Sequence, residues 1–166
     1  MRNHEIAKVF EEIADMSEFL GDNPFRVRAY REAARILAGL ETPVEALAQQ
    51  GVEALEAIPG IGRVIALKIL TYLEMGKLKK HEELKQKVPA GVLQVMQVPG
   101  IGGKTAKRLY DQLGVDSLAR LREVLESGAV LSLPGFGKQR RARLLHNLAV
   151  VETEGSQPRE SGKILM

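Results

Sequence analysis

Three short segments of this 166-residue sequence repeat one pattern: an apolar residue, Pro, Gly, a second apolar residue and Gly. The copies lie at 58–62, 98–102 and 133–137, at spacings of 40 and 35 residues. Pro ends a preceding helix, and the glycines permit positive φ and leave no Cβ between the backbone and a ligand. The second glycine opens a helix whose first N–H groups lack internal partners and lie at the positive end of the helix dipole. The pattern therefore predicts three backbone anion sites that suit a DNA phosphate without reading any base.

The simpler interpretation of each copy is a tight turn between two helices that binds no ligand. Three copies in register, each followed by a basic residue, favour phosphate binding over that interpretation. A nucleotide-binding loop is not indicated, because Gly103-Lys104-Thr105 lacks the upstream glycine of a P-loop. No predicted strand precedes any copy, which argues against a dinucleotide-binding fingerprint.

A basic residue stands ten positions after the start of each copy, as Lys68, Arg108 and Arg143. A deprotonated lysine amine can attack an aldehyde to form a Schiff base, which an arginine cannot do. Lys68 is therefore a candidate nucleophile, provided that its surroundings lower its pKa from the usual value of about 10.4. The alternative stays open that Lys68, Arg108 and Arg143, which occupy the same position in each copy, all bind phosphate. The apolar residues expected to surround the Lys68 amine are Ile65, Leu67 and Ile69.

The charge is uneven along the chain, although the formal net charge is only +3. Residues 91–150 hold nine Lys/Arg and four Asp/Glu, and 138–143 (Lys-Gln-Arg-Arg-Ala-Arg) is the densest basic stretch. Such a patch suits a polyanion, and the alternative is a solvated helix face. The absence of cysteine excludes disulfides, thiol catalysis and Cys-ligated zinc. No apolar stretch approaches the roughly 20 residues of a membrane span, so we expect a cytoplasmic protein that does not bind membranes.

Helical periodicity runs through the sequence, and no segment alternates like a strand. Asn23 and Pro24 suit the N-cap and first position of one helix, along which Arg28, Arg31 and Arg35 form one stripe. We therefore predict an all-α fold, with Gly51 interrupting a helix that starts at Thr42. The predicted helices cover 3–20, 24–38, 42–50, 63–75, 81–87, 90–97, 103–113, 117–127 and 138–150, and 155–162 is typical of a linker.

With these elements in place, three segments carry a family resemblance: 21–30 (Gly-Asp-Asn-Pro-Phe-Arg-Val-Arg-Ala-Tyr), the first Pro-Gly copy, and 76–80 (Gly-Lys-Leu-Lys-Lys). The chain resembles the N-terminal portion of a bacterial family X DNA polymerase, a relative of DNA polymerase beta, over residues 3–150. The resemblance implies two small helical domains built around helix-hairpin-helix motifs. A lyase-type domain with the first hairpin would span 1–88, and a domain with two hairpins that grips duplex DNA would span 89–150. Residues 151–166 would link them to a catalytic region beyond this sequence.

The resemblance also implies the roles of individual residues. DNA contacts are expected at Gly60, Gly62, Gly100, Gly102, Lys104, Arg108, Gly135, Gly137, Lys138 and Arg140. A 5′-phosphate would be held by Arg26, Tyr30 and Lys80, although Val64 replaces a basic ligand of the family. Lys68 would be the Schiff-base lysine, although Leu67 replaces the glutamate that usually precedes it. A monovalent cation, Na⁺ or K⁺, would bind the backbone carbonyls of Ile58 and Ile61, with that of Glu56, and of Val98 and Ile101, with that of Met96.

Nucleotidyl transfer needs clustered carboxylates that hold two metal ions. The sequence contains no Asp-x-Asp, so we do not expect this chain to polymerise DNA, and Mg²⁺ or Mn²⁺ would belong to the catalytic region. DNA binding itself would need no cofactor. His4, His81 and His146 are scattered and are expected on the surface.

These observations favour a DNA-binding region of a repair polymerase that recognises gapped, nicked or 5′-phosphorylated DNA. It would be a monomer located at the nucleoid, and a deoxyribose-phosphate (abasic-site) lyase activity at Lys68 is a further expectation. The alternative is an architectural helix-hairpin-helix module that binds duplex DNA and catalyses nothing. A protein-interaction domain is a third class, which the charge of 138–143 disfavours because interface cores are poor in charge.

Overall fold

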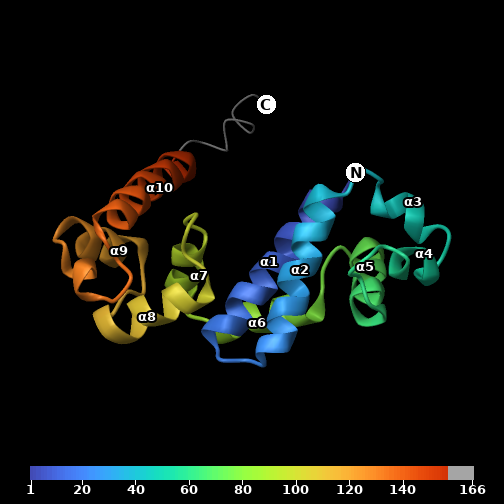
Figure 1. The fold of residues 1–166 in the computed structure, drawn as a ribbon, viewed down its shortest axis with the longest axis horizontal. Coiled ribbons are helices and arrows are strands. Elements are labelled where there is room, and N and C mark those ends of the chain that lie inside the picture. Colours follow the sequence, from blue (N-terminus) through green and yellow to red (C-terminus); the bar gives the residue numbers. More distant parts are fainter. Residues whose placement is uncertain (157–166) are drawn as a thin grey trace. The chain divides into compact units, whose positions relative to one another are not determined.

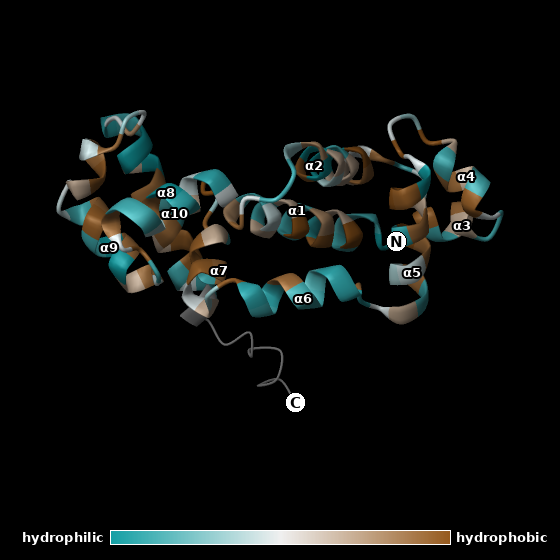
Figure 2. Cartoon of the chain, turned by 90° about the horizontal axis from the view of Figure 1, so that it is seen from below, coloured by the Kyte–Doolittle hydropathy of each residue, from teal (hydrophilic) through white to brown (hydrophobic). Residues whose placement is uncertain are grey.

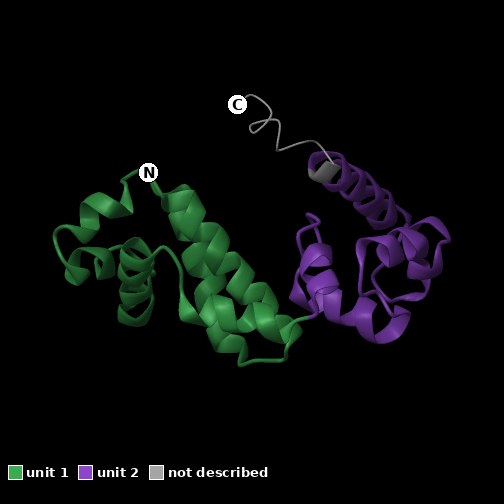
Figure 3. Cartoon of the chain, turned by 180° about the vertical axis from the view of Figure 1, so that it is seen from behind, with its two compact units in different colours: residues 1–88 green, residues 89–166 purple. Residues whose placement is uncertain are grey.

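The computed structural model describes residues 1–156, and the regular structure of these residues is entirely helical. The chain divides into two compact units, Met1–Val88 and Pro89–Met166 (Figure 3). In the described range, both units consist of helices joined by turns and short loops, as Figure 1 shows. The predicted all-α class is therefore confirmed.

Unit 1 is built on a long antiparallel pair, α1 (Asn3–Phe19) and α2 (Pro24–Gly39), which lie side by side in Figure 1. The Asn23 side chain accepts a hydrogen bond of 2.8 Å from the N–H of Phe25, so the predicted N-cap of α2 is confirmed. The remaining helices of the unit are α3 (Val44–Ala48), α4 (Val52–Glu56), α5 (Arg63–Met75) and α6 (Lys79–Lys87). Gly51, with φ +105°, separates α3 from α4 as the sequence predicts.

The core of unit 1 lies along the inner face of α1, where Ile6, Phe10 and Ile13 are fully buried. Phe10 meets Tyr30 of α2 edge to face, with ring centroids 5.6 Å apart. Figure 2 shows the apolar residues of α1 on one side of the helix, as its periodicity requires. The burial of these side chains fixes α2, and so places Arg26 and Tyr30.

Two of the three arginines in the α2 stripe, Arg31 and Arg35, pair with carboxylates of unit 1. Arg31 donates to carboxylates of Glu11 at 2.8 Å, Asp15 at 2.9 Å and Glu18 at 3.0 Å, all on α1. Arg35 pairs with Glu32 on its own helix. One guanidinium group therefore fastens α2 to an acidic row on α1.

Asp15 gives unit 1 an unusual pH dependence. Burial raises the pKa of its carboxyl from 3.8 to about 6, although the hydrogen bond from Arg31 opposes the rise. The folded state then holds this proton more tightly than the unfolded chain, so Asp15 costs stability as pH rises from about 4 to 6. The cost reaches about 3 kcal/mol above that window. We expect urea denaturation to show Asp15→Asn gaining stability relative to the wild type as pH rises from 4 to 7. The opposite trend would mean that Arg31 dominates the titration.

His81 is buried, and its predicted surface position is wrong. Its side chain is 9% exposed, and its Nε2 lies 2.8 Å from Glu12 Oε1, which ties α6 to α1. The two residues lie 69 positions apart, so no local pattern reveals the pair. Because α6 also carries Lys80, this contact helps to place a predicted phosphate ligand.

Unit 2 places two hairpins among short helices. Its elements are α7 (Ala90–Met96), α8 (Gly103–Leu113), α9 (Leu118–Glu126), the 3₁₀ helix η1 (Ala129–Ser132) and α10 (Lys138–Ser156). Helix α10 runs through Ser156, so the linker predicted from residue 151 is wrong for 151–156. Glu152 pairs with Arg122 of α9, which anchors this added turn and a half. The rest of the predicted linker, 157–166, lies outside the described residues.

Candidate nucleic-acid interface

The first hairpin joins α4 to α5 through a bend that leaves main-chain donors open. Gly60 has φ +92°, and the N–H of Ile61 donates to the carbonyl of Ile58 at 3.0 Å, which closes the turn. The first bond of the new helix runs from Ala66 N–H to Gly62 at 2.9 Å. The N–H groups of Gly62, Arg63 and Val64 therefore have no partner within residues 1–156, and no side chain caps the helix.

The second and third hairpins repeat this geometry in unit 2. Ile101 N–H donates to Val98 at 3.0 Å, and Phe136 N–H donates to Leu133 at 3.1 Å. Gly100 and Gly135 have φ +97° and +85°, the same left-handed conformation as Gly60. The N–H groups of Gly102 and Gly137 have no acceptor in the described part of the chain. All three bends thus present open amides at a helix N-terminus.

Each bend is held by an apolar residue between its glycines. Ile61, Ile101 and Phe136 are about as buried as core residues, whereas Gly60, Gly100 and Gly135 are exposed. A Cβ on Gly60 would lie 2.5 Å from Ile36 Cδ1, and one on Gly100 would lie 3.1 Å from Leu144 Cδ2. Both contacts are with the ends of flexible side chains, so it is the positive φ of Gly60 and Gly100 that favours glycine at these two positions.

The two hairpins of unit 2 are tied to each other. Arg108 of α8, which follows the second hairpin, donates to the carbonyl of Pro134 in the third. Asn147 of α10, which follows the third hairpin, donates to the carbonyl of Pro99 in the second at 2.9 Å. Arg140 donates to Thr105 Oγ1 at 3.0 Å, which adds a further bond between α10 and α8. The helix after each bend thus donates a hydrogen bond to the other bend, so the two bends are held together as one element.

Positive charge converges around this element. Burial lowers the pKa of the Arg140 guanidinium, and the nearby charges of Arg108 and Arg143 lower it further. Arg140 lies 4.1 Å and Arg108 5.6 Å from the centre of the Phe136 ring. Exposed Lys138 and Arg143 form no ion pair within residues 1–156. These two side chains can meet a phosphate beside the open amides.

Two arginines of the basic stretch 138–143 make hydrogen bonds inside unit 2, whereas Lys138 and Arg143 remain exposed; the sequence alone does not distinguish these two groups. Arg141 donates to the carbonyls of Leu125 and Glu126 and so caps the C-terminus of α9. Arg140 bonds to Thr105 as described above, whereas Lys138 and Arg143 are exposed and make no such bond among residues 1–156. Lys104, after the second hairpin, is exposed at the first turn of α8.

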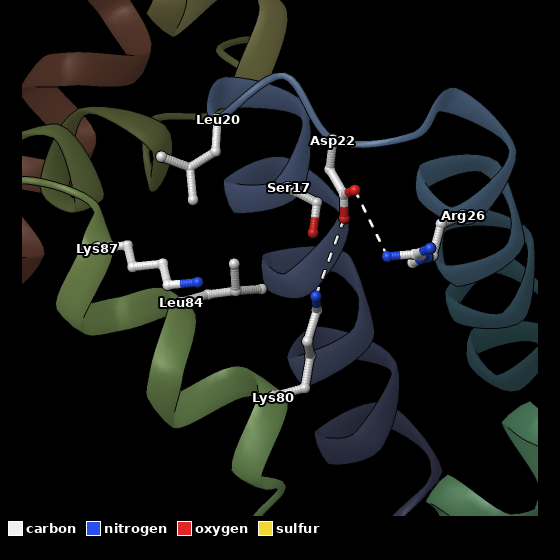
Figure 4. A pocket seen from close by; sticks show the side chains of 7 residues that line it. All are labelled: Ser17, Leu20, Asp22, Arg26, Lys80, Leu84 and Lys87. Atoms are coloured by element: carbon white, nitrogen blue, oxygen red, sulfur yellow. Dashed lines mark hydrogen bonds and ion pairs between the residues drawn. The ribbon is translucent and has the colours of Figure 1, made fainter.

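Two of the three predicted 5′-phosphate ligands meet in unit 1. Arg26 and Lys80 line a cavity of about 320 Å³ together with Asp22 (Figure 4). Tyr30 does not line this cavity, because its ring is turned into the core against Phe10 and its burial raises the pKa of its hydroxyl. The cavity also involves residues that sequence analysis missed: Ser17, Leu20, Leu84 and Lys87. They come from α1 and α6, and no sequence signal joins these helices.

Lys68 lies half-buried on α5 and does not line that cavity. Ile65 and Ile69 are buried beneath it, but Leu67 is 45% exposed on the outer face of the helix. Leu67 therefore adds no buried apolar wall, and the apolar surround of the Lys68 amine stays a prediction. Lys68 has no carboxylate partner within residues 1–156, so its amine is open to a ligand.

The bends also offer carbonyl oxygens of the kind that a monovalent cation prefers. The Ile58 and Val98 carbonyls each accept one hydrogen bond, and those of Ile61 and Ile101 accept none from the described residues. The Na⁺ or K⁺ site expected at these carbonyls stays a prediction. Among residues 1–156 no group of His, Asp and Glu side chains is arranged to hold a metal ion. No described helix is long and apolar enough to cross a membrane.

The geometry of both units matches known helix-hairpin-helix models. Residues 1–78 match a helix-hairpin-helix domain, and residues 92–148 match a SAM-like helix-hairpin-helix tandem. The chain thus consists of helix-hairpin-helix DNA-binding domains, one with a single hairpin and one with a pair.

Three known proteins with similar sequences indicate which group of helix-hairpin-helix proteins this chain resembles. The chain is 35% identical over 158 residues to the DNA polymerase/3′-5′ exonuclease PolX of Bacillus subtilis, which covers 95% of this chain and 26% of PolX. It is 32% identical over 121 residues to DNA polymerase lambda of Rattus norvegicus, covering 72% of this chain and 20% of that protein. It is also 35% identical over 111 residues to the Holliday junction branch migration complex subunit RuvA of Nitrosospira multiformis, covering 67% of this chain and 48% of RuvA.

The chain belongs to the family X DNA polymerases, and it corresponds to their N-terminal helix-hairpin-helix region. It spans about a quarter of the length of PolX and a fifth of that of polymerase lambda.

Proposed function

We propose that this chain holds DNA by its backbone, without regard to base sequence, as part of a family X repair polymerase. The observation that carries the proposal is the set of main-chain amides at three glycine bends that have no hydrogen-bond partner among residues 1–156. Such amides suit phosphate oxygens and carry no sequence information. Exposed Lys138 and Arg143 beside the third bend add the sequence-independent electrostatic attraction that duplex DNA requires.

Gapped or nicked DNA with a 5′-phosphate is the proposed substrate, bound by a monomer at the nucleoid in the cytoplasm. The support is the cavity in which Arg26 and Lys80 face the same space. Binding needs no cofactor, and Na⁺ or K⁺ at the Ile58, Ile61, Val98 and Ile101 carbonyls would steady the bends against a phosphate. An architectural module that lacks strand-end recognition would instead bind blunt duplex as tightly as gapped DNA.

Salt dependence tests the backbone-binding proposal. Three hairpins that each neutralise about two phosphates give a slope of log K against log salt of roughly −5. We expect fluorescence anisotropy with gapped DNA to give such a slope, for several unrelated base sequences alike. A slope near zero would contradict DNA binding as the role of this chain.

Substitution of the helix-opening glycines tests the bends themselves. Gly62 has extended backbone (φ −88°, ψ 179°), and a Cβ on Gly62 or Gly137 would meet nothing within 4 Å. Gly62→Val and Gly137→Val should therefore fold normally but hold a phosphate away from the amides, and each should weaken DNA binding about tenfold. Gly100 and Gly135 are poorer choices because their positive φ strains any other residue. Gly39→Val, also exposed and open, is the matched control, and equal loss in that variant would contradict the assignment.

A lyase activity at Lys68 is a second proposed function. The observation that favours it is an amine on the helix after the first hairpin, half-buried and without a carboxylate partner in the described range. The amine nitrogen would attack C1′ of an open abasic sugar, and the carbonyl oxygen would leave as water to give a Schiff base.

A further inference from the structure

The outer face of α5 presents apolar side chains to solvent beside the first bend. Val64 is 68% exposed and Leu67 is 45% exposed, although both are aliphatic. They stand three residues apart, which makes them neighbours on one helix face with Cβ atoms about 5–6 Å apart. Side chains on an α-helix tilt toward its N-terminus, so both lean toward the open amides of Gly62 and Arg63. This pair, the Val64–Leu67 platform, therefore borders a proposed phosphate site.

The other two hairpins carry different residues at the same positions. Six and nine residues after the start of each copy, the second hairpin has Lys104 and Lys107, and the third has Gln139 and Ala142. All four are exposed, as the platform is. A duplex carries one charge per about 1.7 Å of its axis, so cations suit a surface that follows paired DNA, as in the second hairpin. The aliphatic platform of the first hairpin favours a different neighbour.

Little charge surrounds the platform. Arg63, in the first turn of α5, donates to Glu56 at 2.9 Å, and this carboxylate offsets its charge. Lys68, one turn beyond Val64, is half-buried and forms no ion pair among residues 1–156. One helix end therefore combines main-chain donors, a single unpaired amine and apolar surface.

A nucleotide matches this combination when its base is unpaired. In a duplex the faces of the bases are stacked inside, and only their edges reach the grooves. An unpaired base can turn its apolar face to the protein while its phosphate is held nearby, and every base has such a face. Burial of that face against Val64 and Leu67 is favourable whichever base is present.

We propose that the Val64–Leu67 platform receives the face of an unpaired base whose phosphate lies on the amides of the first bend. Unit 1 then prefers DNA with an unpaired nucleotide to continuous duplex, whereas the lysines of the second hairpin suit paired DNA. This inference rests on the proposed backbone binding, and it adds the class of nucleotide that the first hairpin selects.

The test compares two gapped DNAs that differ only in whether the base pairs beside the gap are matched or mismatched. Both carry 5′-hydroxyl ends and the same number of phosphates, so the ratio of their Kd values measures recognition of unpaired bases. We expect the wild type to bind the mismatched DNA about tenfold more tightly, because a mismatch lowers the cost of unstacking. Leu67→Ala removes apolar surface without adding charge, so it should reduce this preference about threefold.

Variants that add a charge separate apolar contact from electrostatic attraction. Val64→Lys introduces the residue of the second hairpin, so it should abolish the preference and make the salt slope on matched DNA more negative by about 1. Met75→Lys is the matched control, because Met75 is 62% exposed on the same helix and lies about 16 Å beyond Val64 along its axis. It adds the same charge and should leave the preference unchanged. Circular dichroism should show the wild-type thermal midpoint for all three variants, since each alters an exposed side chain.

A preference that survives in both Leu67→Ala and Val64→Lys would overturn the role of the platform, as would an equal loss in Met75→Lys. Tight DNA binding with no preference in the wild type would overturn this inference and leave backbone binding intact. Absence of DNA binding would overturn the proposed function itself.

Sedimentation of the DNA-free protein tests the other occupant that an apolar helix face could take, a second copy of this chain. We expect the wild type and Val64→Lys to sediment alike as monomers. A wild-type dimer that dissociates in Val64→Lys would assign the platform to that second copy and overturn the inference.

Discussion

Replacement of Gly91 by Ala is expected to destabilise unit 2 by at least about 3 kcal/mol. A Cβ at this position would lie 1.8 Å from the carbonyl oxygen of Asp116 and 2.9 Å from its carbonyl carbon. Both are backbone atoms, so no rotamer change relieves the clash, and α7 must separate from the connection between α8 and α9. Chemical denaturation followed by circular dichroism should show a lower midpoint for this unit.

Gly137→Ala provides the control for that experiment within the same unit. A Cβ there meets nothing within 4 Å, so its stability should stay within about 0.5 kcal/mol of the wild type. A Gly91→Ala protein as stable as this control would show that α7 and Asp116 do not approach as closely as described. Because α7 leads into the second hairpin, the substitution should also weaken duplex binding.

Lys68→Ala is expected to abolish covalent trapping on an abasic substrate, with a loss of at least about 100-fold. Borohydride reduces the C=N bond of a Schiff base to a secondary amine and so links protein to DNA irreversibly. Alanine has no amine, and Arg63, the nearest basic residue along the chain, cannot form this bond. The measurement is the yield of the cross-linked species on a denaturing gel.

Lys79→Ala serves as the comparison for Lys68. Lys79 is 89% exposed and makes only a surface pair with Glu83 at 3.9 Å, so its loss should leave trapping unchanged. An adduct that persists in Lys68→Ala would assign the chemistry to another amine. Absence of any adduct in the wild type would instead support the alternative that Lys68, like Arg108 and Arg143, only contacts phosphate.

Local chemistry made much of the fold predictable. Proline, paired glycines and the Asn23 cap act within a few residues, so the bends and the start of α2 could be located without a structure. The repeat also made the resemblance to family X polymerases recognisable, and the comparisons confirm it. The period of 3.6 residues gave the positions of most helices for the same reason.

Contacts between distant residues explain what could not be predicted. His81 pairs with Glu12, and Ser17 and Lys87 line one cavity, only because α6 folds back on α1. Arg31 and Arg141 look alike in sequence to arginines that face solvent, yet each is engaged by another helix. Leu67 was predicted as part of an apolar surround of Lys68, and its exposure of 45% could not be read from the sequence around it.

The reciprocal bonds from Arg108 to Pro134 and from Asn147 to Pro99 bear on how tightly unit 2 can bind. They join the two bends in the free protein, so under the proposed backbone binding little conformational entropy is lost when both bends engage DNA. The second contact then forms at a high effective concentration once the first has formed. Asn147→Ala removes the bond to Pro99 and none of the proposed phosphate ligands, so it should lower avidity.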